Sequence, residues 1–181
     1  MIIAASLKTL FTGMTIDVDG KTYNVQTTGG NQDMLDKFIA ECDRVSADKF
    51  PLIFYVTNPV KDYNGYKECD TTIVILTNTN PNWLSGERTF QNFTKVIQPV
   101  YEKMVYELNK SPYIQEMTES KKDRYEYTDI PNFGLLESTS STAEKDFNKV
   151  GREKSEKSVI TDYVDARSIK LRIRIKTECI T

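Results

Sequence analysis

The most regular pattern of hydrophobic and polar positions lies near the end of the printed sequence, over residues 168–177. Apolar and cationic residues alternate there without interruption: Ile169, Leu171, Ile173 and Ile175 take one set of positions, and Lys170, Arg172, Arg174 and Lys176 take the other. Successive side chains of a β-strand point to opposite faces of the sheet. The pattern therefore predicts a strand over 168–178 with one buried face and one cationic face.

Three further segments predict strands. Residues 51–57 form an apolar run that begins with a proline, which a strand tolerates at its first position. Residues 70–78 hold four consecutive apolar residues, which indicates burial on both faces and a central strand. These two segments predict a long antiparallel hairpin. Within 14–27, Asp19-Gly20 separates two alternating stretches and favours a type I′ turn, so we expect a hairpin in the same sheet.

Helical spacing of apolar residues marks three segments. Residues 2–11 predict a short amphipathic helix, and residues 31–46 predict a second one that follows the glycine pair Gly29-Gly30, interpreted as a flexible break, and is capped by Asn31. Residues 87–109 predict the longest helix, with Ser85 as its cap and Pro99 kinking or splitting it. The fold class that follows is α+β, a mixed, largely antiparallel sheet flanked by helices, in one domain over residues 1–181.

Residues 112–158 have a different character. The segment is dense in charge, contains a Ser/Thr-rich stretch and has few repeating apolar positions. Loops of this length are rare inside compact domains. We therefore expect a long irregular excursion before the final strand, an extended insertion that is partly ordered by Tyr125, Tyr127, Phe133, Leu135 and Leu136 and reaches away from the body to touch a neighbouring molecule.

The composition excludes several kinds of site. The chain of 181 residues has no histidine, which removes Ser-His-Asp and Cys-His nucleophiles and every zinc site that uses histidine. Its three cysteines, Cys42, Cys69 and Cys179, lie far apart with no CxxC pair, and we interpret them as core residues of a protein from a reducing compartment. We expect no catalytic residue, no cofactor and no bound metal.

Two glycine motifs have simpler explanations than ligand binding. Residues 17–20 resemble part of a calcium loop, but Thr15 and Gln26 occupy the positions that need Asp and Glu. The pair Gly29-Gly30 lacks the longer pattern of a nucleotide loop.

The start of the sequence lacks a basic segment before its apolar run, and no stretch is long enough to cross a bilayer, so we expect neither secretion nor a membrane.

The cationic row Lys170, Arg172, Arg174 and Lys176 has two interpretations. It is either a solvated strand face or the binding surface of an anionic partner, which is an acidic protein surface or nucleic-acid phosphate. The overall net charge of −2 favours the acidic protein partner if the chain assembles. Trp83, Tyr125 and Tyr127 are candidate interface residues, and tyrosines such as Tyr63 and Tyr66 could stack on bases.

The order of elements resembles the tail-terminator, tail-completion and head–tail neck ring proteins of tailed bacteriophages, notably phages of Bacteroidetes hosts. The resemblance covers most of the chain outside 112–158. It rests on the N-terminal helix, the Asp-Gly hairpin, the proline-led strand Phe50–Phe54, the buried strand Ile73–Leu76, the helical segment Val96–Glu102 and the closing segment from Asp162–Ala166 onward.

The resemblance implies a structural virion protein without catalytic residues, cofactor or metal. Its subunits would form a homo-oligomeric ring at the head–tail connector, neck or tail terminus, assembled in the host cytoplasm. They would contact other neck, tail or portal-proximal proteins, with DNA only passing through the ring and no membrane. Two alternatives stay open: a nucleic-acid-binding module that uses the basic final strand, and a small enzyme that works without histidine.

Overall fold

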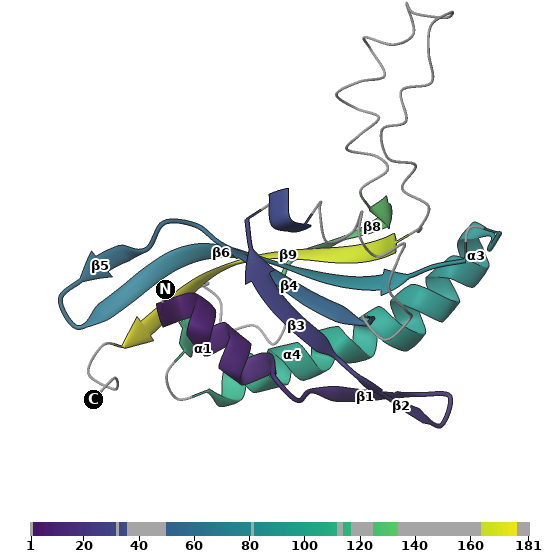
Figure 1. The fold of residues 1–181 in the computed structure, drawn as a ribbon, viewed down its shortest axis with the longest axis horizontal. Coiled ribbons are helices and arrows are strands. Elements are labelled where there is room, and N and C mark those ends of the chain that lie inside the picture. Colours follow the sequence, from purple (N-terminus) through teal and green to yellow (C-terminus); the bar gives the residue numbers. More distant parts are fainter. Residues whose placement is uncertain are drawn as a thin grey trace, which may run out of the picture.

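The computed structural model describes residues 2–31, 33–35, 50–80, 82–111, 114–116, 125–133 and 164–176. Helices and strands are mixed, and most strand pairs are antiparallel (Figure 1). The predicted α+β fold class is therefore confirmed.

Three antiparallel strands form the centre of the main sheet. They are β4 (Leu52–Thr57), β6 (Tyr66–Asn78) and β9 (Val164–Lys176). All 13 residues of β6 pair with β9, from Tyr66 opposite Lys176 to Asn78 opposite Val164. The predicted central hairpin and the alternating final strand are confirmed, although β9 begins four residues before the cationic pattern, at Val164.

Four further strands complete a seven-stranded sheet. Strand β3 (Gln26–Gly30) runs parallel to β4, and β5 (Lys61–Tyr63) pairs with β6. Strands β7 (Ile114–Glu116) and β8 (Tyr127–Phe133) both pair with β9. The expectation of an irregular excursion over 112–158 was therefore wrong for these two stretches, because they belong to the sheet of the body. The rest of that segment lies outside the described residues.

The N-terminal hairpin forms a sheet of its own. Strands β1 (Thr15–Val18) and β2 (Lys21–Asn24) pair only with each other, and they project from the main sheet in Figure 1. Asp19 and Gly20 both have positive φ, 50° and 77°, as a type I′ turn requires. The hairpin is confirmed, but its place in the main sheet was wrong, since only β3 continues from it into that sheet.

The glycine pair is part of strand β3 rather than the flexible break that we expected. Gly29 lies opposite Tyr55 in the parallel pairing of β3 and β4. A Cβ atom at Gly29 would lie 2.0 Å from Cε2 of Tyr55, and Tyr55 is only 4% exposed. The glycine is therefore required for packing, because the tyrosine ring covers its backbone.

The helices follow the predicted order with different ends. α1 (Ile2–Phe11) is as expected, and α3 (Ser85–Arg88), the π-helix η3 (Thr89–Ile97) and α4 (Gln98–Lys110) form one continuous helical segment. Ser85 is not the cap, because Leu84 holds that position and its backbone N–H donates to Glu87 Oε2 at 3.2 Å. Pro99 lies at the start of α4, where the helix type changes.

Only residues 33–35 of the second predicted helix, over 31–46, are described, and they are helical. Asn31 caps them as expected, since its Oδ1 accepts a hydrogen bond from the Met34 backbone at 2.9 Å. The remainder of that prediction lies outside the described residues.

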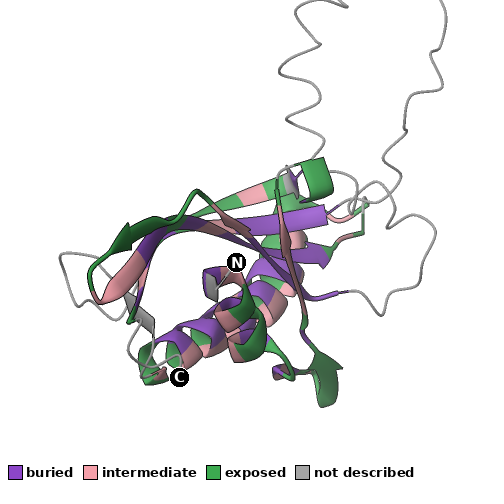
Figure 2. Ribbon diagram, turned by 60° about the vertical axis from the view of Figure 1, so that its left-hand side comes forward, coloured by how far each residue is buried: buried purple, intermediate pink, exposed green. Residues whose placement is uncertain are grey.

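Two hydrophobic cores lie on the two faces of the main sheet. The larger packs α1, η3 and α4 against one face, and includes Leu7, Ile53, Ile73, Met104 and Ile173. The smaller lies on the other face, and includes Leu35, Phe54, Val74, Phe133 and Val164. Figure 2 shows buried positions along the strands and on the side of the helices that faces them. The cationic positions of β9 share their face with the smaller core.

Candidate interaction surfaces

The cationic row of β9 lies beside carboxylates of the neighbouring strand. In the β6–β9 register Arg174 is opposite Glu68, and Arg172 is opposite Asp70. Arg172 Nε lies 2.7 Å from Asp70 Oδ1, and Arg174 Nη2 lies 3.2 Å from Glu68 Oε2. Directly opposed residues of an antiparallel pair share one face of the sheet. Two carboxylates beside the row are thus supplied by β6 of the same chain, whereas the acidic-partner interpretation assigned them to a neighbouring molecule.

The ion pair at Asp70 alters the titration of both groups. The hydrogen bond from Arg172 lowers the pKa of the Asp70 carboxyl, and the hydrogen bond to Asp70 raises the pKa of the Arg172 guanidinium. Both side chains are about half exposed, at 50% and 52%, so solvent screens the pair. Its main effect is to hold Arg172 in place on the sheet.

Cations remain in excess on this face. Lys61 of β5 lies opposite Glu68, while Lys170 and Lys176 lie opposite Thr72 and Tyr66. Neither Lys170 nor Lys176 forms an ion pair within the described part of the chain. We call the following seven residues the charged face: Lys61, Glu68, Asp70, Lys170, Arg172, Arg174 and Lys176. It carries five cations and two carboxylates.

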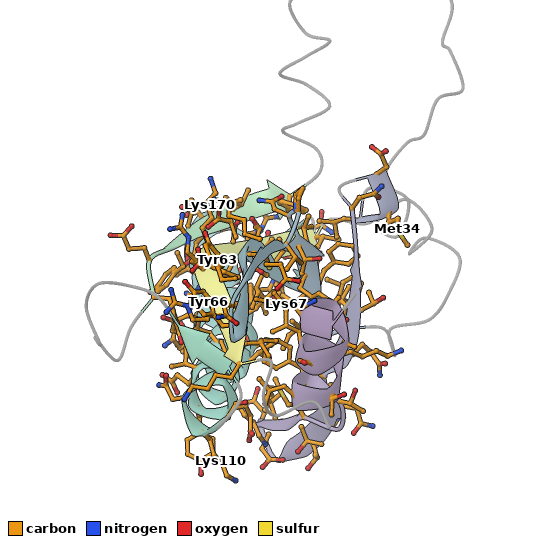
Figure 3. All side chains as sticks on the ribbon, turned by 90° about the vertical axis from the view of Figure 1, so that its left-hand side faces the viewer. Met34, Tyr63, Tyr66, Lys67, Lys110 and Lys170 are labelled. Carbon is orange, nitrogen blue, oxygen red and sulfur yellow. The ribbon has the colours of Figure 1, made fainter. Side chains whose placement is uncertain are left out.

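An aromatic stack lies at one end of the charged face. The rings of Tyr63 and Tyr66 are stacked with centroids 4.7 Å apart, and the Arg174 guanidinium lies 3.9 Å from the Tyr66 ring centroid. Tyr63 is 42% exposed. Figure 3 shows both tyrosines at the end of the molecule that carries β5. The order Tyr63, Tyr66, Arg174 is a three-layer stack whose outermost ring is open to solvent.

A shallow groove lies at the other end of the charged face. It has a volume of about 540 Å³ and is lined by Asn58, Asp70, Thr71, Thr72, Lys170, Leu171 and Arg172. Amide, hydroxyl, ammonium and guanidinium groups thus border the same depression, and they can donate hydrogen bonds to an anion. The Asp70 carboxylate also lines the groove, where its charge is paired with Arg172.

Trp83 borders a second groove, which we call the tryptophan groove. It has a volume of about 530 Å³ and lies between the β1–β2 hairpin, the end of β6 and η3. Its lining includes Asp19, Tyr23, Asn80, Trp83 and Gln91. The sequence marked Trp83 as an anchor or an interface residue, and the structure places it in the wall of a groove.

Large hydrophobic side chains are exposed beside the tryptophan groove. Leu84 is 75% exposed and Phe90 is 53% exposed, and each follows or precedes a lining residue in the chain. Lys95 connects this patch to the hairpin, because its Nζ lies 2.7 Å from Asp19 Oδ2 and 4.9 Å from the Phe90 ring centroid. Exposed apolar side chains gathered around a groove are typical of a protein-binding surface.

The two tyrosines proposed as interface residues lie in different surroundings. Tyr125 is only 6% exposed, and its backbone N–H and C=O both bond to the Tyr101 hydroxyl, at 3.0 and 3.2 Å. Its assignment to an interface was therefore wrong, because it is a core residue of this chain. Tyr127 is 45% exposed, and the Arg167 guanidinium lies 3.9 Å from its ring centroid.

The start of β9 carries a buried polar cluster that the sequence pattern did not predict. Arg167 makes a bidentate pair with Asp129 of β8, at 2.6 and 2.9 Å, and also donates to Gln98. Asp165 is fully buried, accepts a hydrogen bond from Asn92 at 2.7 Å and lies 3.6 Å from Arg88. The sequence did contain a signal for this cluster. Extending the alternation of β9 backwards places Asp165 and Arg167 on the same face as the apolar Ile169.

Metal-ligating groups are not gathered anywhere in the described ranges, where no three His, Cys, Asp or Glu side chains are placed to hold an ion. Of the three cysteines, Cys69 is a buried free thiol whose pKa is raised by burial, while Cys42 and Cys179 lie outside the described residues. The helices of the described ranges include none that is long and apolar enough to cross a membrane.

No protein-family model matches the chain, and no curated protein matches it in sequence.

Proposed function

We propose that this protein is a structural subunit that assembles with copies of itself, as the ring-forming subunit of a bacteriophage head–tail connector, neck or tail terminus. One observation carries the self-assembly: Leu84 and Phe90 are exposed beside the tryptophan groove. In protein interfaces a few large buried side chains contribute most of the binding free energy, and tryptophan is common among them. A neighbouring subunit would cover this apolar surface in the assembly.

The placement of this surface supports a head-to-tail contact. In Figure 1, α3 and the β1–β2 hairpin lie at one end of the long axis, and β5 lies at the other end. A surface confined to one end of an elongated subunit joins that end to a different surface of the next copy. Heterologous contacts of this kind close into rings when the rotation between subunits permits it.

The assignment to a phage ring rests on the order of elements. The chain has an N-terminal helix, an Asp-Gly hairpin, central antiparallel strands, a long helix and a final alternating strand, in this order. The proposal takes this order, as the sequence resemblance does, for that of the phage ring proteins. The location that follows is the virion, with other neck, tail or portal-proximal proteins as neighbours.

Native mass is the decisive measurement for self-assembly. Wild-type protein should form an oligomer of fixed stoichiometry in light scattering or native mass spectrometry. The double variant Leu84→Ser with Phe90→Ser should shift the population to monomer, because it removes the apolar surface. Tyr106→Ser is the matched control, since Tyr106 is 60% exposed on α4 and does not line the groove.

Circular dichroism should show the same fold for all three proteins. A monomeric wild type at high concentration contradicts the proposal, as does an oligomer that the double variant leaves intact. To test the ring itself, negative-stain images of the wild-type oligomer should show closed particles rather than open filaments.

A further inference from the structure

The charged face combines features that a lone basic strand does not have. Its cations exceed its carboxylates by five to two, in a chain whose net charge is −2. Three of the cations, Lys61, Lys170 and Lys176, have no ion-pair partner in the described part of the chain. Lys170 and Lys176 lie at the two ends of the cationic row, about 20 Å apart along the strand. The unpaired positive charges are therefore spread along the strand, where they could contact several anionic groups of one ligand.

The ion pairs inside the row fix the positions of its central cations. Asp70 and Glu68 hold the Arg172 and Arg174 side chains against the sheet. Arg174 in turn supports the ring of Tyr66, on which Tyr63 stacks. The outer face of Tyr63 is thereby held in position for a further planar group. A stacking partner that also carries regularly spaced negative charge would use both parts of the surface.

From this arrangement we infer that the charged face is a binding site for single-stranded nucleic acid. A base would stack on the exposed ring of Tyr63, and the phosphates that follow would run along β9 toward Lys170. The groove bordered by Asn58, Thr72 and Lys170 would accept a phosphate at the far end. Stacking tolerates any base, and salt bridges to phosphates read no sequence, so the binding would be independent of sequence.

The geometry of the charged face favours a single-stranded nucleic acid over an acidic protein surface or a nucleic-acid duplex. An acidic protein surface would satisfy Lys170 and Lys176 but would leave the open Tyr63 ring without a planar partner. The bases of a duplex are stacked on one another, so the ring could not take one without unstacking it. This inference is independent of self-assembly, because the charged face and the tryptophan groove have no lining residue in common.

Fluorescence anisotropy of a labelled oligothymidylate of about 12 nucleotides tests the inference. Wild-type protein should bind it at low salt, and the logarithm of affinity should fall linearly with the logarithm of salt concentration. Tyr63→Ala should weaken binding by about 5- to 150-fold, the range for loss of one base stack. The double variant Lys170→Ala with Lys176→Ala should reduce the salt slope by about 1.4, corresponding to two lost phosphate contacts.

The control uses a matched pair on the opposite face of the sheet. Tyr106 and Lys110 of α4 are both exposed, and the Lys110 ammonium lies 5.7 Å from the Tyr106 ring centroid. The double variant Tyr106→Ala with Lys110→Ala also removes one exposed tyrosine and one exposed lysine, and it should bind like the wild type. Figure 3 shows Lys110 at the opposite end of the view from Lys170.

Three results would overturn the inference. One is the absence of binding at low salt. Another is binding that the Tyr63 and lysine variants reduce no more than the control does. The third is tighter binding of polyglutamate, or of duplex, with no effect of Tyr63→Ala. Light scattering of each variant in the same buffer separates these results from a change in assembly.

Discussion

Arg167 differs from the other arginines of β9 at the scale of single residues. It is 3% exposed, forms a bidentate pair with Asp129 and stacks on Tyr127, whereas Arg172 pairs with Asp70 in solvent. Removing one partner of a buried ion pair leaves a desolvated charge behind, which costs far more than losing a screened surface pair. Residues of one type on one strand thus have opposite roles, set only by the face on which they lie.

The residue-scale prediction compares these two arginines. Arg167→Met should lower the free energy of unfolding by about 3 kcal/mol, because Asp129 loses its partner in a partly buried site. Arg172→Met, on the same strand, should change it much less. Urea denaturation followed by circular dichroism provides both values. Equal shifts for the two variants would show that the Arg167 pair is as weakly coupled to folding as a surface pair.

The same residues mark what a sequence can and cannot predict at this scale. Alternation over 169–176 correctly predicted which side chains of β9 are buried, because the period of a strand is fixed by its geometry. The partners of the cations could not be predicted. Glu68 and Asp70 lie more than 100 residues away in the sequence, and they meet Arg174 and Arg172 only through the β6–β9 register. Burial of Tyr125 was missed for the same reason, since its partner is the Tyr101 hydroxyl.

Local pattern predicted the elements themselves well where their periodicity was strong. The final strand, the central strands and the long helix were all expected at nearly the right residues. Strands β7 and β8 were missed because they lie in a charged, polar segment with few repeating apolar positions, and β7 has only three residues. They form strands because the edge of β9 that does not pair with β6 has free backbone N–H and C=O groups, and β7 and β8 pair with these groups. Such pairing depends on the tertiary fold and not on the local sequence. Strand β3 was missed because two glycines normally indicate a turn.

Gly29 provides the element-scale prediction. Gly29→Ala should destabilise the protein by about 1 to 3 kcal/mol, since the added Cβ collides with the buried Tyr55 ring. Gly86→Ala is the control, because no atom lies within 4 Å of its added Cβ and alanine favours a helix. It should be neutral or slightly stabilising. In thermal denaturation, Gly29→Ala should lower the melting temperature, and Gly86→Ala should leave it unchanged or raise it slightly. An unchanged melting temperature for Gly29→Ala would contradict the packing of Tyr55 against Gly29.

At the scale of the whole molecule, one sheet joins two cores that share no buried residue. Neighbouring positions of β4 belong to different cores, with Ile53 in the larger core and Phe54 in the smaller. The same holds for Ile73 and Val74 of β6. Neither core can open without disturbing strands that the other core needs. The part of the chain that the structure describes should therefore unfold as a single unit.

Core variants on the two faces test this cooperativity. Ile173→Ala in the larger core and Phe54→Ala in the smaller should each cost about 2 to 5 kcal/mol through the cavity that they leave. Both should move the same transition to lower urea without changing its slope, because the two cores melt together. Trp83 is the only tryptophan of the chain and reports on the groove end, while far-UV circular dichroism reports on all helices and strands. The two signals should coincide in the wild type and in both variants. If Phe54→Ala instead separates them into two transitions, the smaller core is an independent unit and the sheet does not couple its two faces.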